Sequence, residues 1–243
     1  NKRLQYQTYN VTDLLSQGSN VIAMALGSGW YRSHLAWEDN KNVYGKDAAL
    51  LFQLDITYAD GSKESIVSDD SWKSTTGSIR YAEIYNGEII DARQQRTGWR
   101  QAGYNASGWN GVVLKDYDKS VLVATQNEPV KKHETFNPVK IFTTPNGEKV
   151  IDFGQNLVGW VMMKAKGNAG DTITVSHAEV LDKNGNFYTE NLRDAKAQAI
   201  YILRGEGEEL FEPHFTFFGF RYIKLDGYPG EIKPENFTAV ALY

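Results

Sequence analysis

The feature that most constrains the fold is a strand-like alternation of apolar and polar residues, which recurs along the chain between turn residues. It is clearest from Leu50 to Val67, where two alternating runs flank the turn sequence Ala59-Asp60-Gly61-Ser62. This arrangement predicts a β-hairpin. Short apolar or alternating runs closed by glycine, asparagine or aspartate predict further strands in "NVIAMALGSGWY", "KVIDFGQNLVGWVMMKAKG", "DTITVSHAEVL", "AIYIL" and "FRYIKLDGY". We therefore expect an all-β protein.

Helix signals are few. "TDLLSQG" opens with Thr12 and Asp13 and closes on Gly18, which predicts one short capped turn or helix. "TENLRDAKAQA" is a second candidate, although its extended flanks leave its assignment open. Helices are expected to contribute little to the core.

The length of 243 residues exceeds the usual domain size of about 100–150 residues. A shift in composition between Asp116 and Pro138, with mixed charges and only one short apolar run, is typical of a linker. We predict two all-β domains, 1–118 and 119–243, each a β-sandwich with a jelly-roll-like layout.

Composition excludes several partners and chemistries. The formal net charge of −4 offers no basic face for nucleic acid, and no apolar run approaches the roughly 20 residues that span a bilayer. Zero cysteines exclude disulfides, thiolate zinc sites and a cysteine nucleophile, but leave the cellular compartment open. The start at Asn1-Lys2-Arg3, with neither an initiator methionine nor a signal sequence, indicates a piece of a longer protein.

No catalytic residue can be assigned from the sequence. The four histidines are scattered without metal-ligand spacing, and none lies in a recognisable nucleophile motif. A glycosidase needs two carboxyl groups about 5–10 Å apart, and the sequence identifies no such pair. An enzyme acting by itself is not supported, and an independent hydrolase is the weakest of the functional hypotheses.

The stretch "SGWYRSHLAWEDNKNVYG" is the first candidate site. It places Trp30, Tyr31 and Trp37 close to a run of carboxylate and amide side chains that includes Glu38, Asp39, Asn40 and Asn42. Aromatic faces stack on sugar rings, while carboxylates and amides bind sugar hydroxyls or hold Ca²⁺ through oxygen. The alternative is a polar loop flanked by core aromatics.

The stretch "AEIYNGEIIDAR" has the same character, with Tyr85, Asn86, Glu88, Asp91 and Arg93 in one short run. The structural alternative is a turn and strand whose polar groups fix one another. Asp91 would then pair with Arg93 or Arg96, and Glu88 with backbone amides, because buried polar groups must be paired in any case.

Taken in order, these motifs resemble a known family. "KRLQYQTYNVTDLL", "GSGWYR", "NVYG", "SDDSWKSTTGSI", "AEIYNGEIIDAR" and "SGWNGV" resemble the N-terminal sandwich of bacterial α-L-rhamnosidases. "VIDFGQNLVGWV", "HAEVLDKNGNFYTENLR" and "FEPHFTFFGFRYIKLDGYPG" resemble the concanavalin-like β-sandwich that follows it. The series spans nearly the whole chain.

The resemblance implies an accessory, non-catalytic part of an enzyme that hydrolyses terminal α-L-rhamnosides. In the family an (α/α)₆ barrel, which carries the acidic pair for inverting hydrolysis, follows the last motif seen here. The expected partners are a rhamnose-containing glycan and that barrel. The alternative is a purely structural scaffold for the barrel. The resemblance favours a periplasmic or extracellular location and leaves the cytoplasm open.

The resemblance also implies a calcium-dependent module that binds terminal L-rhamnose. It places Asp39 and Asn40 against calcium or sugar, with Asn86 and Glu88 as a second pair. The expected sugar contacts are Trp37, Asp39, Asn40, Tyr85, Asn86 and Glu88. The expected calcium ligands are Asp39, Asn40 and Asn86, and Asp91 and Arg93 would support the site.

Overall fold

The computed structural model describes residues 2–35 and 40–243, which form two compact units. Each unit is assembled from three segments of the chain. Unit 1 comprises Asn1–Leu26, Asp47–Thr76 and Arg96–Glu128, and unit 2 comprises Gly27–Lys46, Gly77–Gln95 and Pro129–Tyr243. Within the described part of the chain, no helix is long and apolar enough to cross a membrane.

Unit 1 is built from pairs of short strands. Its elements are β1 (Leu4–Tyr6), a 3-10 helix (Thr12–Leu14), β2 (Gln53–Thr57), β3 (Lys63–Val67), β4 (Lys73–Ser74), β7 (Asn110–Gly111), a 3-10 helix (Lys119–Val121) and β8 (Leu122–Ala124). β1 pairs with β8 in parallel, whereas β2–β3 and β4–β7 are antiparallel. Each pair is a separate two-stranded sheet.

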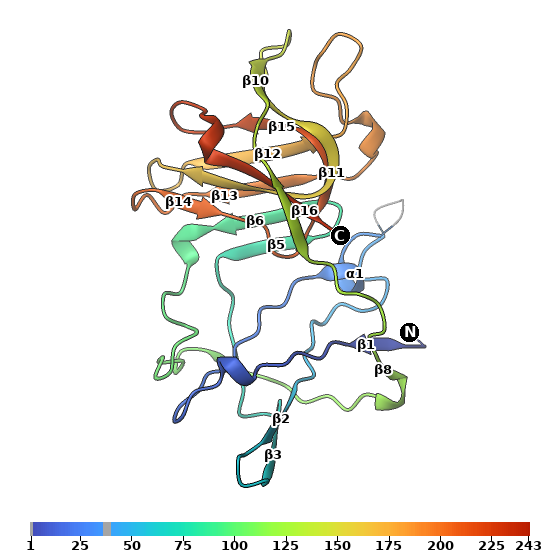
Figure 1. The fold of residues 1–243 in the computed structure, drawn as a ribbon, viewed down its shortest axis with the longest axis vertical. Coiled ribbons are helices and arrows are strands. Elements are labelled where there is room, and N and C mark those ends of the chain that lie inside the picture. The colour runs from blue at the N-terminus through green and yellow to red at the C-terminus, as the bar shows by residue number, and fades with distance from the viewer. Residues whose placement is uncertain (1, 36–39) are drawn as a thin grey trace. The chain divides into compact units, whose positions relative to one another are not determined.

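Unit 2 contains one large sheet, which curls around its core in Figure 1. Its elements are α1 (Gly29–Arg32), β5 (Ile79–Glu83), β6 (Gly87–Asp91), a 3-10 helix (Ala92–Gln94), β9 (Lys132–Phe136), β10 (Lys140–Thr143), β11 (Lys149–Ala165), β12 (Thr172–Ala178), a 3-10 helix (Glu190–Leu192), β13 (Gln198–Ile202), β14 (Glu209–Phe211), β15 (Phe218–Asp226), a 3-10 helix (Pro234–Asn236) and β16 (Phe237–Leu242). The main strand order is β5-β6-β13-β12-β15-β11-β16-β9, and β10 and β14 also pair with β11.

The core of unit 2 lies on the inner face of this sheet. Ile151, Met163, Phe220 and Ile223 are fully buried there, and Phe153 packs edge-on against Phe220 with ring centroids 5.9 Å apart. Buried and less buried residues tend to alternate along these strands, because successive side chains of a strand point to opposite faces of the sheet. Burial of these apolar side chains is the main stabilising term of the fold.

The all-β prediction is confirmed. The hairpin predicted around Asp60 and Gly61 is β2–β3, and the runs predicted as strands after residue 148 form β11, β12, β13 and β15. "TDLLSQG" contains only a 3-10 turn, and "TENLRDAKAQA" contains a 3-10 turn followed by the start of β13.

The strand predicted in "NVIAMALGSGWY" is wrong. No strand forms between residues 20 and 31, and α1 begins at Gly29, which has a φ of 51°. At Gly27 a Cβ atom would lie 2.5 Å from the ring of Phe215, so the chain there is shaped by close packing rather than by strand pairing.

The predicted domain boundary after residue 118 stays a prediction. The compact units do not follow one cut in the sequence, because residues 27–46 and 77–95 belong to the same unit as residues 129–243. The jelly-roll-like layout also stays a prediction.

Candidate functional site

The candidate site is in unit 2, where the turn between β5 and β6 lies beside segment 27–46. β6 pairs in parallel with β13, with Gly87 opposite Gln198. Gly87 has a φ of 101°, and a Cβ atom there would lie 1.7 Å from the carbonyl oxygen of Gln198. Only glycine fits this close approach. The Asn86-Gly87 sequence therefore docks the turn against β13.

Backbone hydrogen bonds fix the turn further. The carbonyl oxygens of Tyr85 and Asn86 accept from the amides of Ala197 and Gln198, at 3.0 and 3.3 Å. The Asn86 side-chain oxygen accepts from the Lys196 amide at 3.4 Å. The two predicted site residues of this turn are therefore held by the strand next to them.

A buried carboxylate, Glu83, lies beneath the turn at the end of β5 and is only 2% exposed. It accepts a short hydrogen bond from Nδ1 of His34, and its other oxygen lies 3.1 Å from Nζ of Lys41. Nδ2 of Asn86 donates to Glu83 at 3.2 Å and to the hydroxyl of Tyr81 at 3.2 Å. Glu83 is therefore the centre of the polar cluster.

The electrostatics of Glu83 follow from these partners. Burial acts to raise the pKa of Glu83, but hydrogen bonds from His34, Tyr81 and Lys41 outweigh it and lower the pKa to about 2. Glu83 therefore carries a negative charge at neutral pH, and Lys41 supplies a neighbouring positive charge.

Two half-exposed aromatic rings lie next to this cluster. The ring centroids of Trp30 in α1 and Tyr85 are 5.6 Å apart in an edge-on arrangement. Trp30 is 48% exposed and Tyr85 is 39% exposed. Neither ring is a core residue, so both have apolar surface available to a ligand.

Within segment 27–46, Leu35 pairs with Asn40 and His34 with Lys41. Residues 36–39 separate these pairs in the sequence. Two predicted contacts, Trp37 and Asp39, fall in this stretch and are outside the described residues. Asn40 is described: it is exposed, and its carbonyl oxygen accepts from the Leu35 amide at 2.8 Å. The structure therefore brings Tyr85 and Asn86 together on one turn, and places Asn40 on the neighbouring segment.

Glu88, predicted as a sugar contact, points into the interior. Its side chain is fully buried, and its carboxylate accepts from the backbone amides of His214 and Phe215 at 3.0–3.2 Å. The hydroxyl of Thr216 donates to the carbonyl oxygen of Ile84 at 3.0 Å, which ties the same loop to the hairpin. This is the backbone pairing that the structural alternative predicts for Glu88.

Asp91 and Arg93 also form the pair that the structural alternative predicts. Nε and Nη2 of Arg93 each donate to a different oxygen of Asp91 at 2.9 Å. Hydrogen bonds from Arg93 hold the pKa of Asp91 below its usual value, against a smaller opposing effect of burial. The pair fixes the end of β6, where Asp91 also caps a 3-10 helix.

Calcium requires six to eight oxygen ligands. Within residues 2–35 and 40–243, no group of three or more His, Cys, Asp or Glu side chains could hold a metal ion. The nearby carboxylates already have partners: Glu83 binds Lys41, Glu88 binds backbone amides, and Asp91 binds Arg93. These three do not fit a calcium site, so the calcium prediction depends on Asp39.

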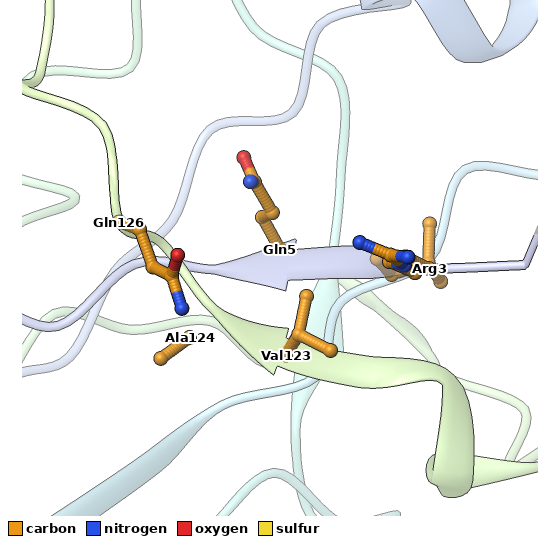
Figure 2. Close-up of a pocket in the computed structure, with 6 residues that line it drawn as sticks. Arg3, Gln5, Val123, Ala124 and Gln126 are labelled. Atoms are coloured by element: carbon orange, nitrogen blue, oxygen red, sulfur yellow. The ribbon is translucent and has the colours of Figure 1, made fainter.

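An open hollow of about 530 Å³ lies in unit 1, along the β1–β8 pair (Figure 2). Its lining consists of Arg3, Leu4, Gln5, Val123, Ala124 and Gln126. In Figure 2 the side chains of Gln5, Val123 and Gln126 lie along the two strands. None of the predicted site residues lines this hollow.

Sequence reasoning missed Glu83, His34, Lys41 and Tyr81. Glu83 and His34 are 49 positions apart, so no local spacing could link them. The sequence signal for Glu83 was weak. Glu83 lies within "AEIYNGEIIDAR", where the alternation of apolar and polar residues does not show whether its side chain faces the core or the solvent.

Comparison with known proteins gives matches along nearly the whole chain. Residues 1–134 match the family model of the α-L-rhamnosidase N-terminal domain, and residues 142–243 match that of the bacterial α-L-rhamnosidase concanavalin-like domain. An α-L-rhamnosidase from Streptomyces avermitilis is 39% identical over 243 residues, which is 100% of this chain and 24% of that protein. One from Formosa agariphila is 35% identical over 97% of this chain and 26% of its own length.

Solved structures agree. The native α-L-rhamnosidase from Aspergillus terreus matches with a TM-score of 0.93 and 40% identity, over 100% of this chain and 28% of that one. The Streptomyces avermitilis α-L-rhamnosidase complexed with L-rhamnose matches with a TM-score of 0.83 and 38% identity, over 88% of this chain and 21% of that one. The chain thus spans about a quarter of the length of the curated relatives. The resemblance seen in the motifs is confirmed: the chain belongs to the α-L-rhamnosidase family, of which it contains the N-terminal and concanavalin-like β domains.

Proposed function

We propose that the chain is a non-catalytic β portion of a longer α-L-rhamnosidase, and that its unit 2 site binds a terminal L-rhamnose unit with calcium. The observation that carries the first part is the order and extent of the two family matches, set against the quarter of the relatives' length that the chain spans. Hydrolysis of terminal α-L-rhamnosides is then the work of the remaining part of the longer protein.

The carboxylates of the site support a non-catalytic role. A glycosidase needs one carboxyl group to protonate the leaving group and a second to act as base or nucleophile across an open cleft. Glu83 and Glu88 are buried and engaged by cations or amides, and Asp91 is held by Arg93. All three carboxylates are thus engaged in structural contacts, which supports a non-catalytic role for this site.

Sugar binding is supported by the rings beside the turn. The half-exposed Trp30 and Tyr85 offer apolar surface for the C–H face of a sugar, and Asn86 lies next to Tyr85 on the same turn. Aromatic faces with a few placed polar groups are the usual make-up of small-ligand sites. Asp39 and Asn40 would supply oxygen ligands to calcium.

The test is calorimetric titration of L-rhamnose into the chain, first with Ca²⁺ and then with a chelator. We expect a heat of binding that depends on calcium. In Asn86→Ala and Tyr85→Ala the apparent affinity for L-rhamnose should fall at least about tenfold, which corresponds to about 1.4 kcal/mol of lost contact energy. Asn156→Ala is the matched control, because Asn156 also lies in unit 2 and is exposed, and its side chain donates to Glu179 at 3.3 Å rather than to a residue of the β5–β6 turn.

Absence of heat from the folded chain under both conditions would contradict the sugar site. Equal losses in Asn86→Ala and Asn156→Ala would also contradict it, because the effect would then be general. Hydrolysis of a rhamnoside by the isolated chain would contradict the non-catalytic role.

A second candidate function is a purely structural support for the rest of the longer enzyme. Unit 1 favours it, because large apolar side chains are exposed there, with Tyr9 at 70%, Leu14 at 77% and Val113 at 83%. Exposed apolar patches of this kind mark interaction surfaces. It predicts that the isolated chain self-associates in analytical ultracentrifugation and that the longer protein does not. A monodisperse chain at high concentration would argue against it.

A further inference from the structure

Segment 27–46 is held together by internal backbone hydrogen bonds. Its backbone closes on itself in successive pairs: Tyr44 N–H donates to Tyr31 O at 3.4 Å, and Leu35 N–H donates to Asn40 O at 2.8 Å. Between them His34 and Lys41 form an antiparallel bridge. We call residues 34–35 and 40–41 the neck. They are the described residues on either side of residues 36–39 in the sequence.

Glu83 contacts both sides of the neck. One carboxylate oxygen accepts from His34 Nδ1 on the incoming side, and the other lies 3.1 Å from Lys41 Nζ on the outgoing side. Because Glu83 is 2% exposed and belongs to β5, the neck is fastened to a fixed point of the sheet. Breaking one arm of such a buried ion pair leaves an uncompensated charge.

The same carboxylate is also linked to the β5–β6 turn. Asn86 Nδ2 donates to Glu83 and to Tyr81, at 3.2 Å each. Three separate pieces of chain, namely the two sides of the neck and the turn, therefore meet at one carboxylate. A residue that only filled space in the core would not need partners from all three.

We propose that Glu83 is a positioning residue, which holds the two sides of the neck and Asn86 at fixed spacing, so that Asn40, Tyr85 and Asn86, the described residues assigned to L-rhamnose, keep fixed positions within unit 2. We call the contacts of Glu83 with His34, Lys41 and Asn86 the clasp. The role of the clasp in ligand binding rests on the proposed function, but its geometry does not. Glu83 does not contact the sugar in this proposal. It acts through His34, Lys41 and Asn86.

The first test is amide hydrogen exchange of the whole chain, read by NMR at Leu35. In Glu83→Gln we expect the Leu35 amide to exchange at least about tenfold faster, while amides of the β12–β13 ladder keep their rates, because local opening is independent of the core. Glu88→Gln is the matched control. It makes the same change in an equally buried glutamate of the same hairpin, and should loosen the amides of His214 and Phe215 but not Leu35.

A second pair of variants keeps the test decisive if Glu83→Gln does not fold. Lys41→Met removes one arm of the clasp at a side chain that is 43% exposed, and Lys41→Arg retains the charge. We expect faster exchange at Leu35 in the first and the original rate in the second. Unchanged exchange at Leu35 in Lys41→Met, or equal acceleration in Glu83→Gln and Glu88→Gln, would overturn the proposal.

Titration of L-rhamnose with Ca²⁺ into the same variants then separates the two proposals. If the unmodified chain binds, the affinity should fall in Lys41→Met and return in Lys41→Arg; equal affinities in both would overturn the positioning role. If the unmodified chain does not bind while Leu35 responds as expected, the proposed sugar site fails and the clasp stands as a structural device.

Discussion

The two units of this chain use similar strand patterns and reach different degrees of burial. Every buried hydrophobic residue of the described chain belongs to unit 2, and none of the described residues of unit 1 is buried. β2 alternates between exposed and half-buried residues and β3 has one half-buried residue, Ile66, whereas β12 is buried along most of its length. Alternation can specify a hairpin, but burial needs a second layer of structure against its apolar face.

The difference in sheet size has an energetic consequence. Full burial of a large apolar side chain is worth about 1.5–3 kcal/mol, and unit 2 gains this many times over its 10-stranded sheet. Unit 1 consists of separate two-stranded sheets, and an isolated hairpin is marginal in water. Unit 2 should therefore determine the measured free energy of unfolding.

The largest expected difference between the two units is in the free energy of unfolding lost in Phe220→Ala and in Tyr58→Ala. Phe220 is fully buried in the core, so its truncation to alanine should lower the free energy of unfolding by about 3–5 kcal/mol. Tyr58 in unit 1 is 46% exposed, and its truncation should change the free energy by no more than about 0.5 kcal/mol. Urea unfolding followed by near-ultraviolet circular dichroism measures both. Similar losses in the two variants would refute the division into a packed and an open unit.

A glycine pair sharpens the comparison at the level of the backbone. Gly61 and Gly87 both have positive φ, at 84° and 101°. A Cβ atom at Gly61 meets nothing within 4 Å, whereas at Gly87 it lies 1.7 Å from Gln198 O. Gly61→Ala should cost about 1–2 kcal/mol from backbone strain alone. Gly87→Ala should cost at least about 2 kcal/mol more, because β6 must also separate from β13. Thermal unfolding of the two variants decides it, and equal costs would contradict the close packing at Gly87.

Acid should destabilise unit 2 through His177. Its ring stacks on Phe218 at 3.9 Å, and Nδ1 donates to Ala197 O at 2.9 Å. Burial lowers the pKa of His177 to about 4, so the unfolded chain takes up the proton first as pH falls. The contribution of neutral His177 to the free energy of unfolding is complete above pH 6.5 and is lost between pH 6.5 and about 4. The total loss should be about 3 kcal/mol.

Urea midpoints at pH 7 and pH 5 check this effect. His177→Phe should flatten the dependence in that range. All four histidines lie in unit 2, so a pH response of the same size in probes confined to unit 1 would count against the assignment.

The smallest expected effect runs in the opposite direction. The Glu88 carboxylate, with one oxygen 3.8 Å from Nδ1 of His214, raises the pKa of His214 above 6.5, against a smaller effect of burial. This contribution is present below pH 6.5 and is lost as pH rises through the folded-state pKa. Because the His214 side chain is 60% exposed, solvent screening keeps the effect small. NMR titration of the His214 ring should show the raised pKa, and Glu88→Gln should abolish the shift.

Much of unit 2 was predictable because its strands are long. The period-two pattern extends far enough in β11, β12 and β15 to be read without knowing the partner strands. The run after Asn20 has equally apolar residues, but Gly27 and Gly29 direct that backbone away from strand pairing. Such tertiary close packing leaves no periodic signal in a sequence.

The site divides in the same way. The pairing of Asp91 with Arg93 joins residues two positions apart, so it could be predicted from the sequence. The Glu83 cluster joins residues from β5, from segment 27–46 and from the turn, and depends on the fold to bring them together. The motif series identified the family but carried no information about Glu83.

The parallel pairing of β6 with β13 has a consequence for synthesis of the chain. The amide of Lys196 donates to Asn86, 110 positions earlier in the sequence. Residues 87–91 pair with β5 on one side, and they gain their second neighbour strand only after residues 198–202 have been made. During translation the β5–β6 hairpin leaves the ribosome before β13 exists, so the outer edge of β6 stays unpaired while more than a hundred further residues are added. Such long-range closure is slow, and an open edge invites pairing with other chains. The interval in which nascent chains aggregate or recruit chaperones should end when β13 emerges.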